Sequence, residues 1–366
     1  MADPRITKLA QVLVQYSLQL GPGDEFLLDT SPLAAELNLA VYKEALLSGA
    51  HVMTSCSIPG TSEIFFKYAN DEQIDYVSPI RWLVAERFSA VLYIDAEHNT
   101  RELSGVDPAR QSRAQKARAE LSKLFYGRAA RKELRWCLTV FPTHASAQEA
   151  DMSLSEYEDF VYGAGMLDRE DPVAAWQEEA ERQRRLIAWL AGKKEVVIRG
   201  DNVDISMSIE GRKFIESAGR VNFPSGEIFT SPVRDSVNGW VRFSYPAIYG
   251  GREVQDIELW FEDGRAVKER ASKGQDLLSA LLDTDERSRY LGELGIGTNY
   301  NIQRFVKNML FDEKIGGTIH LALGAGFPEA GGDTDSGLHW DMLCNMAQGE
   351  ILVDGELFYQ NGQFVV

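Results

Sequence analysis

The segment Ala90-Val-Leu-Tyr-Ile-Asp95 is a short, continuous apolar run, and such a run predicts a buried β-strand. Further short strands are predicted at residues 25–29, 51–56 and 135–141, with amphipathic segments that favour helices between them. Strands that alternate with helices at this spacing are typical of βαβ units. The first half of the chain is therefore predicted to be an α/β N-terminal domain with a mostly parallel sheet.

The second half of the chain has a different pattern. Short alternating strands, most of them separated by glycine-containing turns, are predicted at residues 195–199, 203–209, 239–245, 256–262, 317–323 and 350–353. One helix, at about residues 274–291, interrupts the series. This pattern indicates a β-rich α+β C-terminal domain. We place the boundary near residues 195–205, so that the two domains comprise residues 1–200 and 201–366.

Composition narrows the range of partners. The 366 residues are 44% hydrophobic and 25% charged, which fits ordered globular domains. The formal net charge of −17 disfavours nucleic acid and anionic lipid, and no apolar run approaches the length of a membrane span. The N-terminus has no basic segment followed by an apolar core, so no secretory signal is expected. The three cysteines are far apart and form no disulfide framework, which favours a cytoplasmic protein.

Histidines near the C-terminus are the first candidates for chemistry. His339 and Asp341 flank one residue, so in an extended chain both side chains point to the same side and can bind one ion. His320 follows two glycines in the apolar segment GGTIHLALG. Each motif by itself is more often a hydrogen-bonded core histidine or a surface pair than a ligand. No GxGxxG or Walker-type spacing follows a strand, so nucleotide binding has no support in the first half.

Three glutamates favour the interpretation of these histidines as metal ligands. Glu227 and Glu293 lie in apolar, glycine-containing sequence, and Glu313 directly precedes the strand that carries His320. We expect Glu293 at the end of the predicted helix. Buried carboxylates without obvious lysine or arginine partners are costly unless they bind metal. Two histidines with several carboxylates suit one or two divalent ions of the zinc, cobalt or manganese type. Cys344, three residues after Asp341, is interpreted as a small core residue and not as a ligand.

Longer motifs carry a resemblance to a known family. They are GEIFTSPVRDSVNGWV (226–241), LLDTDERSRYLGELGIGTN (281–299), LFDEKIGGTIHLALG (310–324) and LHWDM (338–342). In this order they resemble the thermophilic metalloaminopeptidases, the family that includes aminopeptidase T and aminopeptidase S. Upstream segments such as RWCLTVFPTHASAQEADMSLSEYEDFVY (135–162) are also similar, so the resemblance covers most of the chain.

The resemblance implies a two-metal hydrolase. It implies two divalent ions (zinc, cobalt, manganese or magnesium) that activate a water molecule, and it makes the second domain the catalytic metal-binding domain. The matching ligands are Glu227, Glu293, His320, His339 and Asp341, with Glu293 as the bridging and catalytic acid. Glu313 is a weaker ligand candidate, because the spacing from FDE to the histidine is stretched by two residues. The implied substrates are short peptides with a free N-terminus, and the implied assembly is a homodimer.

One position departs from the family. A tyrosine near the metals is replaced by Phe327, in the segment GAGFP. If the tyrosine hydroxyl stabilises the oxyanion, its loss costs on the order of 2.7–4 kcal/mol in transition-state stabilisation. Tyr249, Tyr300 and Tyr359 are possible substitute donors.

Two other functions remain open. The 2,5-dihydroxypyridine dioxygenases resemble the same architecture and hold one Fe(II) by two histidines and an acid. His320, His339 and Asp341 could form such a site, although that family has a histidine where this chain has Glu293, which favours hydrolysis. The other alternative is a metal-binding homologue that has lost peptidase activity.

Overall fold

The computed structural model describes residues 3–366, which form two compact units. The first unit runs to Ala175 and also contains Gly219–Pro224, and the second comprises Trp176–Ala218 and Ser225–Val366. The short return segment Gly219–Pro224 contributes a strand to the first unit, so the chain passes between the units more than once.

The first unit is built on a five-stranded parallel sheet in the order β2-β1-β3-β4-β8. Its strands are β1 (Glu25–Thr30), β2 (His51–Cys56), β3 (Ala90–Asp95), β4 (Arg135–Val140) and β8 (Asn222–Phe223). Phe26, Leu28, Val91 and Leu92 are fully buried, as expected for parallel strands that are covered on both faces. The predicted parallel α/β fold is therefore confirmed.

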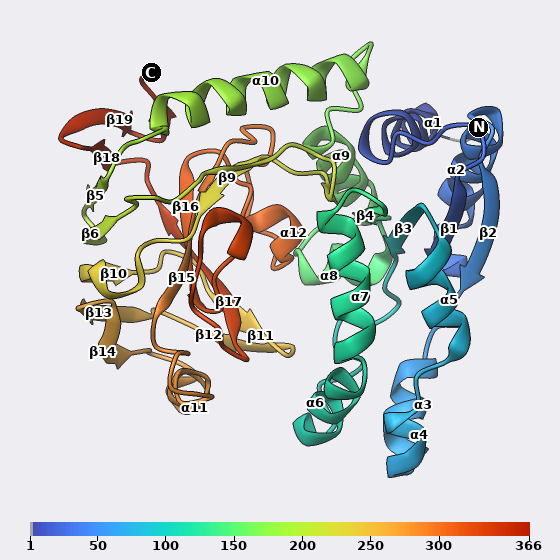
Figure 1. Cartoon of the computed structure of the whole chain (residues 1–366), viewed down its shortest axis with the longest axis horizontal. Helices are drawn as coiled ribbons and strands as arrows, with labels where there is room; N and C mark the ends of the chain where they lie inside the picture. Colours follow the sequence, from blue (N-terminus) through green and yellow to red (C-terminus); the bar gives the residue numbers. More distant parts are fainter. Residues whose placement is uncertain (1–2) are drawn as a thin grey trace. The chain divides into compact units, whose positions relative to one another are not determined.

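Helices connect these strands and lie beside the sheet (Figure 1). They are α1 (Pro4–Gln11), the π-helix η1 (Val12–Ser17), η2 (Pro32–Ala34), α2 (Ala35–Leu47), α3 (Thr61–Tyr68), α4 (Asp71–Asp75), α5 (Pro79–Arg87), α6 (Pro108–Ala117), α7 (Ala119–Ala130), α8 (His144–Glu149) and α9 (Leu154–Ala164). Side chains that accept hydrogen bonds from the first backbone amides start many of them, as Ser153 does for α9.

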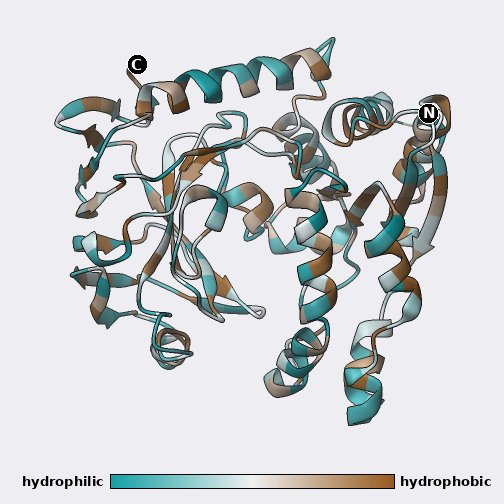
Figure 2. Cartoon of the chain, in the orientation of Figure 1, coloured by the Kyte–Doolittle hydropathy of each residue, from teal (hydrophilic) through white to brown (hydrophobic). Residues whose placement is uncertain are grey.

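Helix α10 (Pro172–Leu190) leads into the second unit. Trp176, Ala180, Gln183, Leu186 and Leu190 are buried, and they recur at the three-to-four-residue spacing of one helix face. Figure 2 shows the resulting mixture of hydrophilic and hydrophobic residues along this helix.

The second unit is dominated by antiparallel sheets, as predicted. An eight-stranded sheet has the order β14-β13-β10-β6-β5-β18-β19-β20, a five-stranded sheet has the order β17-β16-β15-β9-β7, and β11 pairs with β12. The strands are β5 (Glu195–Gly200), β6 (Val203–Ser208), β7 (Ile215–Ser217), β9 (Glu227–Thr230), β10 (Asn238–Arg242), β11 (Ala247–Tyr249), β12 (Arg252–Val254), β13 (Glu258–Glu262), β14 (Arg265–Arg270), β15 (Leu291–Gly297), β16 (Thr318–Gly324), β17 (His339–Asn345), β18 (Glu350–Val353), β19 (Glu356–Gln360) and β20 (Gln363–Phe364). The short helices are η3 (Arg234–Ser236), α11 (Gln275–Leu282), α12 (Met309–Asp312) and η4 (Pro328–Ala330).

The prediction of a helix over residues 274–291 is wrong in its second half. Helix α11 ends at Leu282, and Leu291 already begins β15. Asp285 accepts a hydrogen bond from the backbone amide of Arg287, and Ser288 accepts one from the amide of Asp285. Such local side-chain bonds compete with helical ones and form a turn. Glu293 therefore lies inside a strand rather than at a helix end.

The core of the second unit places the central strands of the five-stranded sheet deep inside it. Every residue of β15 and of β16 is buried. Leu294, Ile296, Ile319 and Leu321 belong to one large hydrophobic cluster that anchors these two strands. Among the described residues, no helix is both long and apolar enough to cross a membrane.

Candidate metal centre

The five-stranded sheet of the second unit brings the predicted ligands onto one face. Glu227 begins β9, Glu293 lies in β15, His320 in β16, and both His339 and Asp341 in β17. These four strands are consecutive neighbours in the sheet (Figure 1).

Strand register explains why the side chains converge. Ala322 of β16 pairs with Glu293 on one side and with Asp341 on the other. His320 lies two residues before Ala322, so it shares that face of the sheet. Gly324, on the same face, pairs with His339. Glycine and alanine at these positions leave room for the larger polar side chains beside them.

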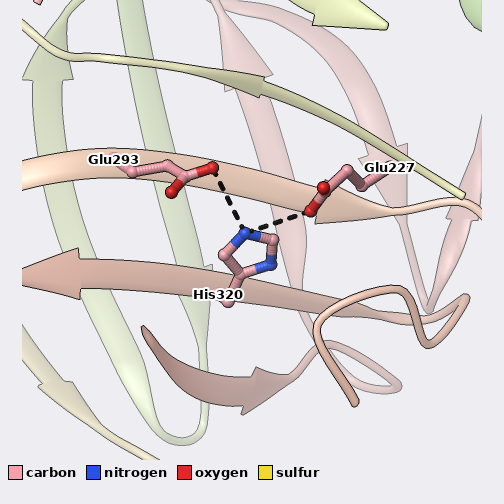
Figure 3. Close-up of side chains that lie close together, drawn as sticks. All are labelled: Glu227, Glu293 and His320. Atoms are coloured by element: carbon pink, nitrogen blue, oxygen red, sulfur yellow. Dashed lines mark ion pairs between the residues drawn. The ribbon is translucent and has the colours of Figure 1, made fainter. Parts of the chain in front are cut away.

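Glu293 lies between the two histidines. One of its carboxylate oxygens is 3.5 Å from Nε2 of His320, and the other is 3.3 Å from Nε2 of His339. Nε2 of His320 is also 3.3 Å from Oε2 of Glu227, and Nε2 of His339 is 3.6 Å from Oδ2 of Asp341. Figure 3 shows the carboxylates of Glu227 and Glu293 on either side of the His320 imidazole. The carboxylate of Glu293 lies between the two histidines, and a carboxylate in that position can contact two cations at once.

All six candidate ligands lie within one cluster. Three overlapping groups have ligand atoms within 4.8 Å of one another: Glu227, Glu293 and His320; Glu293, His339 and Asp341; and Glu313, His320 and Asp341. The stretched spacing therefore does not keep Glu313 away from the other residues.

The histidine ring at residue 339 is oriented for ligation. Its Nδ1 is 2.9 Å from the carbonyl oxygen of Ala325, and a proton on Nδ1 makes this contact a hydrogen bond. That tautomer directs the lone pair of Nε2 toward Glu293 and Asp341, which is how ligating histidines are commonly fixed. His339 is also 32% exposed, so solvent reaches the cluster at this side chain.

Unpaired buried atoms show that the cluster suits a cation. Oδ1 of Asp341 is buried without a hydrogen-bond partner among the described residues, and Oε2 of Glu227 has no hydrogen bond there beyond its 3.3 Å ion-pair contact with His320. Such orphaned oxygens are costly unless an ion or another donor contacts them. The donor set of carboxylate oxygens and imidazole nitrogens suits divalent ions such as zinc, cobalt and manganese. The residues present therefore fit a divalent metal.

The pKa values of the clustered side chains also fit a cation site. Burial alone lowers the pKa of a histidine, but the carboxylate of Glu293 raises the pKa of His320 to about 10 and that of His339 to about 9. Burial also tends to raise the pKa of Glu293, yet the two histidines lower it to about 2. Burial raises the pKa of Glu227 to about 7 and that of Asp341 to about 6. Without a cation the two imidazoles thus hold protons strongly, and a cation bound at their Nε2 atoms would displace those protons.

A lysine that was not predicted completes the cluster. The side chain of Lys314 is wholly buried, with Nζ 2.6 Å from Oε1 of Glu227, and it forms a second ion pair with Glu313. The expectation that these glutamates have no basic partner is therefore wrong. Lys314 directly follows Glu313 in the FDEK segment, and that adjacency was the available signal. Its burial is possible because two carboxylates compensate the charge.

Phe327 lies beside the cluster, just after β16. Its ring centroid is 5.2 Å from that of His339 and 5.0 Å from that of Phe229. The tyrosines considered as substitute donors have other contacts in the structure. Tyr300 donates a hydrogen bond to the carbonyl of Gly362, Tyr249 packs against Trp340, and Tyr359 packs against Phe364.

Comparisons with known proteins confirm the resemblance seen in the sequence. The profile of the family described as thermophilic metalloprotease (M29) matches residues 2–364. Aminopeptidase 2 of Geobacillus stearothermophilus is 28% identical over 96% of this chain and 94% of its own length. Aminopeptidase T of Thermus thermophilus is 29% identical over 88% of this chain and 85% of its own length.

Solved structures show the same fold. Wild-type AmpT from Thermus thermophilus superimposes with a TM-score of 0.85 at 24% identity and covers 99% of both chains. The 2,5-dihydroxypyridine dioxygenase from Pseudomonas putida KT2440 gives a TM-score of 0.60 at 14% identity, covering 100% of this chain and 98% of its own. Because the family profile spans nearly the whole chain, this protein belongs to the thermophilic metalloprotease (M29) family.

Proposed function

We propose that this protein is a metal-dependent aminopeptidase that removes the N-terminal residue from short peptides. Membership of a metalloprotease family supports peptide hydrolysis, and the relatives named aminopeptidases support cleavage at the N-terminus. The observation that carries the proposal is Glu293, which extends one oxygen toward each of two histidines in a buried cluster of acids.

Two divalent ions are the proposed cofactors. Glu293 belongs both to the group with Glu227 and His320 and to the group with His339 and Asp341, so it is the residue placed to bridge them. Glu313 is an additional ligand candidate through its group with His320 and Asp341. When bound, zinc, cobalt, manganese or magnesium would supply Lewis-acid activation of the scissile carbonyl and of water.

The surrounding residues define how a peptide would enter. His339 is the partly exposed member of the cluster, and the ring of Phe327 packs against it. A substrate that reaches the cluster from this side meets an apolar ring where the family resemblance implies a hydroxyl. The side chain of Phe327 therefore donates no hydrogen bond, and oxyanion stabilisation falls to other groups.

We infer that the catalytic domain predicted at residues 201–366 corresponds to the second unit, which starts earlier, at Trp176, and lacks Gly219–Pro224. We also infer that the protein is a cytoplasmic homodimer and that it acts without nucleic-acid or membrane partners. The net charge of −17 supports the last inference, and free cysteines at 56, 137 and 344 agree with a reducing compartment. A dimer rests on the family resemblance and is tested by the molar mass in solution.

A mononuclear iron site is the alternative on this fold. The dioxygenase shares the architecture, and His320, His339 and Asp341 could bind a single ion. The central position of Glu293 favours the hydrolase instead, because it adds a bridging carboxylate to those three residues.

The test combines metal analysis with substrate hydrolysis. The apoprotein is reconstituted separately with each candidate metal and with Fe(II), and is then assayed on a panel of aminoacyl p-nitroanilides. We expect up to two bound divalent ions and hydrolysis that is absent when the α-amine is acetylated. Binding of a single oxygen-sensitive iron without hydrolysis would support the dioxygenase, and bound metal without hydrolysis of any aminoacyl amide would indicate an inactive homologue.

A further inference from the structure

Lys314 is a fixed positive charge inside the proposed metal centre. Its side chain is fully buried. Its backbone is held on both sides, because its amide donates to the carbonyl of Phe311 and its own carbonyl accepts from the amide of Asn299. The backbone is therefore fixed, and the ammonium group lies between the carboxylates of Glu227 and Glu313.

The ammonium acts at one end of the cluster only. Its ion pairs are with Glu227 and Glu313, and each of these acids joins a different ligand group with His320. The group formed by Glu293, His339 and Asp341 shares neither of those two acids. The cluster therefore has one end where a lysine already neutralises the carboxylates and one end where only histidines face them.

A cation and a lysine compete for the same carboxylates. At an effective dielectric constant of about 20, two unit charges 4 Å apart interact strongly enough to change an equilibrium constant roughly a thousandfold. A residue that merely orients a ligand typically changes metal affinity about tenfold to a hundredfold. We therefore expect the repulsion between the ammonium and an incoming divalent ion to outweigh the benefit of holding Glu227 in place.

We propose that Lys314 makes the two metal positions unequal. Glu293, His339 and Asp341 hold the tightly bound ion, and the position formed by Glu227, Glu293 and His320 beside Lys314 holds a weakly bound, exchangeable ion. This inference rests on the proposed function, since it takes the cluster to be a metal centre. It assigns Lys314 as the residue that sets the concentration of metal at which the second position fills.

The experiment is a titration of the apoprotein with Zn²⁺ alone, followed by calorimetry and checked by metal analysis after dialysis. The wild type is expected to bind in two steps whose dissociation constants differ at least tenfold. Lys314→Met keeps the length of the side chain and removes the charge, so it is expected to tighten the weak step at least tenfold while the tight step changes less than threefold. Lys194→Met is the matched control, because Lys194 is an exposed lysine paired with Glu210 at the surface, and both steps should stay as in the wild type.

A second variant separates charge from positioning. Lys314→Gln removes the charge but keeps hydrogen-bond donors, so it should behave like Lys314→Met if repulsion decides. If Lys314 only positions its carboxylates, the weak step becomes weaker in Lys314→Met and is partly restored in Lys314→Gln, and the proposal is overturned. Two equal binding steps in the wild type also overturn the proposal, as does a single bound ion in both the wild type and Lys314→Met. If the variants do not fold, the titration of the wild type still decides between two unequal steps and two equal ones. Absence of metal binding and of hydrolysis in the wild type would instead reject the proposed function itself.

Discussion

Gly295 lies directly opposite His320 in the pairing of β15 with β16, and a Cβ atom at residue 295 would lie 2.0 Å from Nε2 of His320. Real Cβ atoms do not approach other atoms so closely. The strand needs glycine here because the imidazole occupies the space above its backbone. Leu294 and Ile296, on either side of Gly295, are buried in the core and point to the opposite face.

Gly295→Ala is therefore expected to displace the imidazole of His320. The added methyl group collides with the ring, so we expect metal affinity to fall at least tenfold, together with a lower melting temperature. Metal analysis and thermal denaturation check this. Gly21→Ala is the control, because an added Cβ at Gly21 meets no atom within 4 Å. Normal metal affinity in Gly295→Ala would show that His320 does not need its present position.

His339→Ala and Asp341→Ala should each remove bound metal with little loss of folded structure. Both side chains lie at the accessible edge of the cluster, where His339 is 32% and Asp341 12% exposed, so removing either leaves the buried core in place. The measurement is metal content with far-ultraviolet circular dichroism on the same samples. His51→Ala, at an exposed histidine of the first unit, provides the comparison. Full metal occupancy in both variants would end the assignment of this pair as ligands.

Phe327→Tyr is expected to give no increase in kcat. The ring packs against Phe229 and His339, so an added hydroxyl is introduced where the neighbouring rings already pack against phenylalanine. Steady-state kinetics of both proteins on a leucine or phenylalanine amide decide the question. A rise of tenfold or more in kcat would mean that the hydroxyl implied by the family is simply missing, because such a donor acts mainly on the transition state.

Asp285 should contribute to stability in a pH-dependent way. Burial tends to raise its pKa, but hydrogen bonds from the amide of Gly337, the hydroxyl of Ser336 and the amide of Arg287 together lower it from 3.8 to about 2. A lowered pKa means that the folded state binds the proton less tightly, so the stabilisation is present above about pH 4 and is lost as the pH falls toward 2.

The variant Asp285→Asn tests this assignment by urea unfolding at several pH values. We expect a loss of about 1 kcal/mol at pH 7, where partial exposure reduces the full effect of the pKa difference. The difference from the wild type should shrink below pH 4. A difference that stays constant or grows in acid would show that the carboxylate charge of Asp285 is not what holds the segment containing Ser336 and Gly337.

The sequence predicted four strands of the first unit, six strands of the second unit and the residue types of the site. It did not predict the strands β9 and β15, which carry Glu227 and Glu293. The apolar run at residues 90–95 and the spacing of His339 and Asp341 are local patterns, and local patterns report strands and shared faces directly. Strand β8 was not predicted, because two residues, Asn222 and Phe223, are too few to show a period.

The arrangement of the site depends on long-range pairing. Glu293 and Asp341 meet because both pair with Ala322, and no local pattern specifies that register. Lys314 looked like an ordinary charged residue next to Glu313, and only the folded chain shows it buried against Glu227. The predicted helix ran too far because the turn at Asp285 is closed by side-chain hydrogen bonds rather than by glycine or proline.

The central claim is that Glu293 joins the two halves of a metal centre that hydrolyses peptides. The most direct measurement is kcat/KM on leucine p-nitroanilide for metal-reconstituted wild type and Glu293→Gln, with metal content determined on the same samples. Glutamine keeps the shape but removes the charge, so we predict a loss of at least about tenfold in metal content or kcat/KM, which corresponds to roughly 1.4 kcal/mol. Glu262→Gln, at an exposed glutamate of β13, should match the wild type. Unchanged kinetics and unchanged metal content in Glu293→Gln would contradict the claim and leave Glu293 as a structural acid.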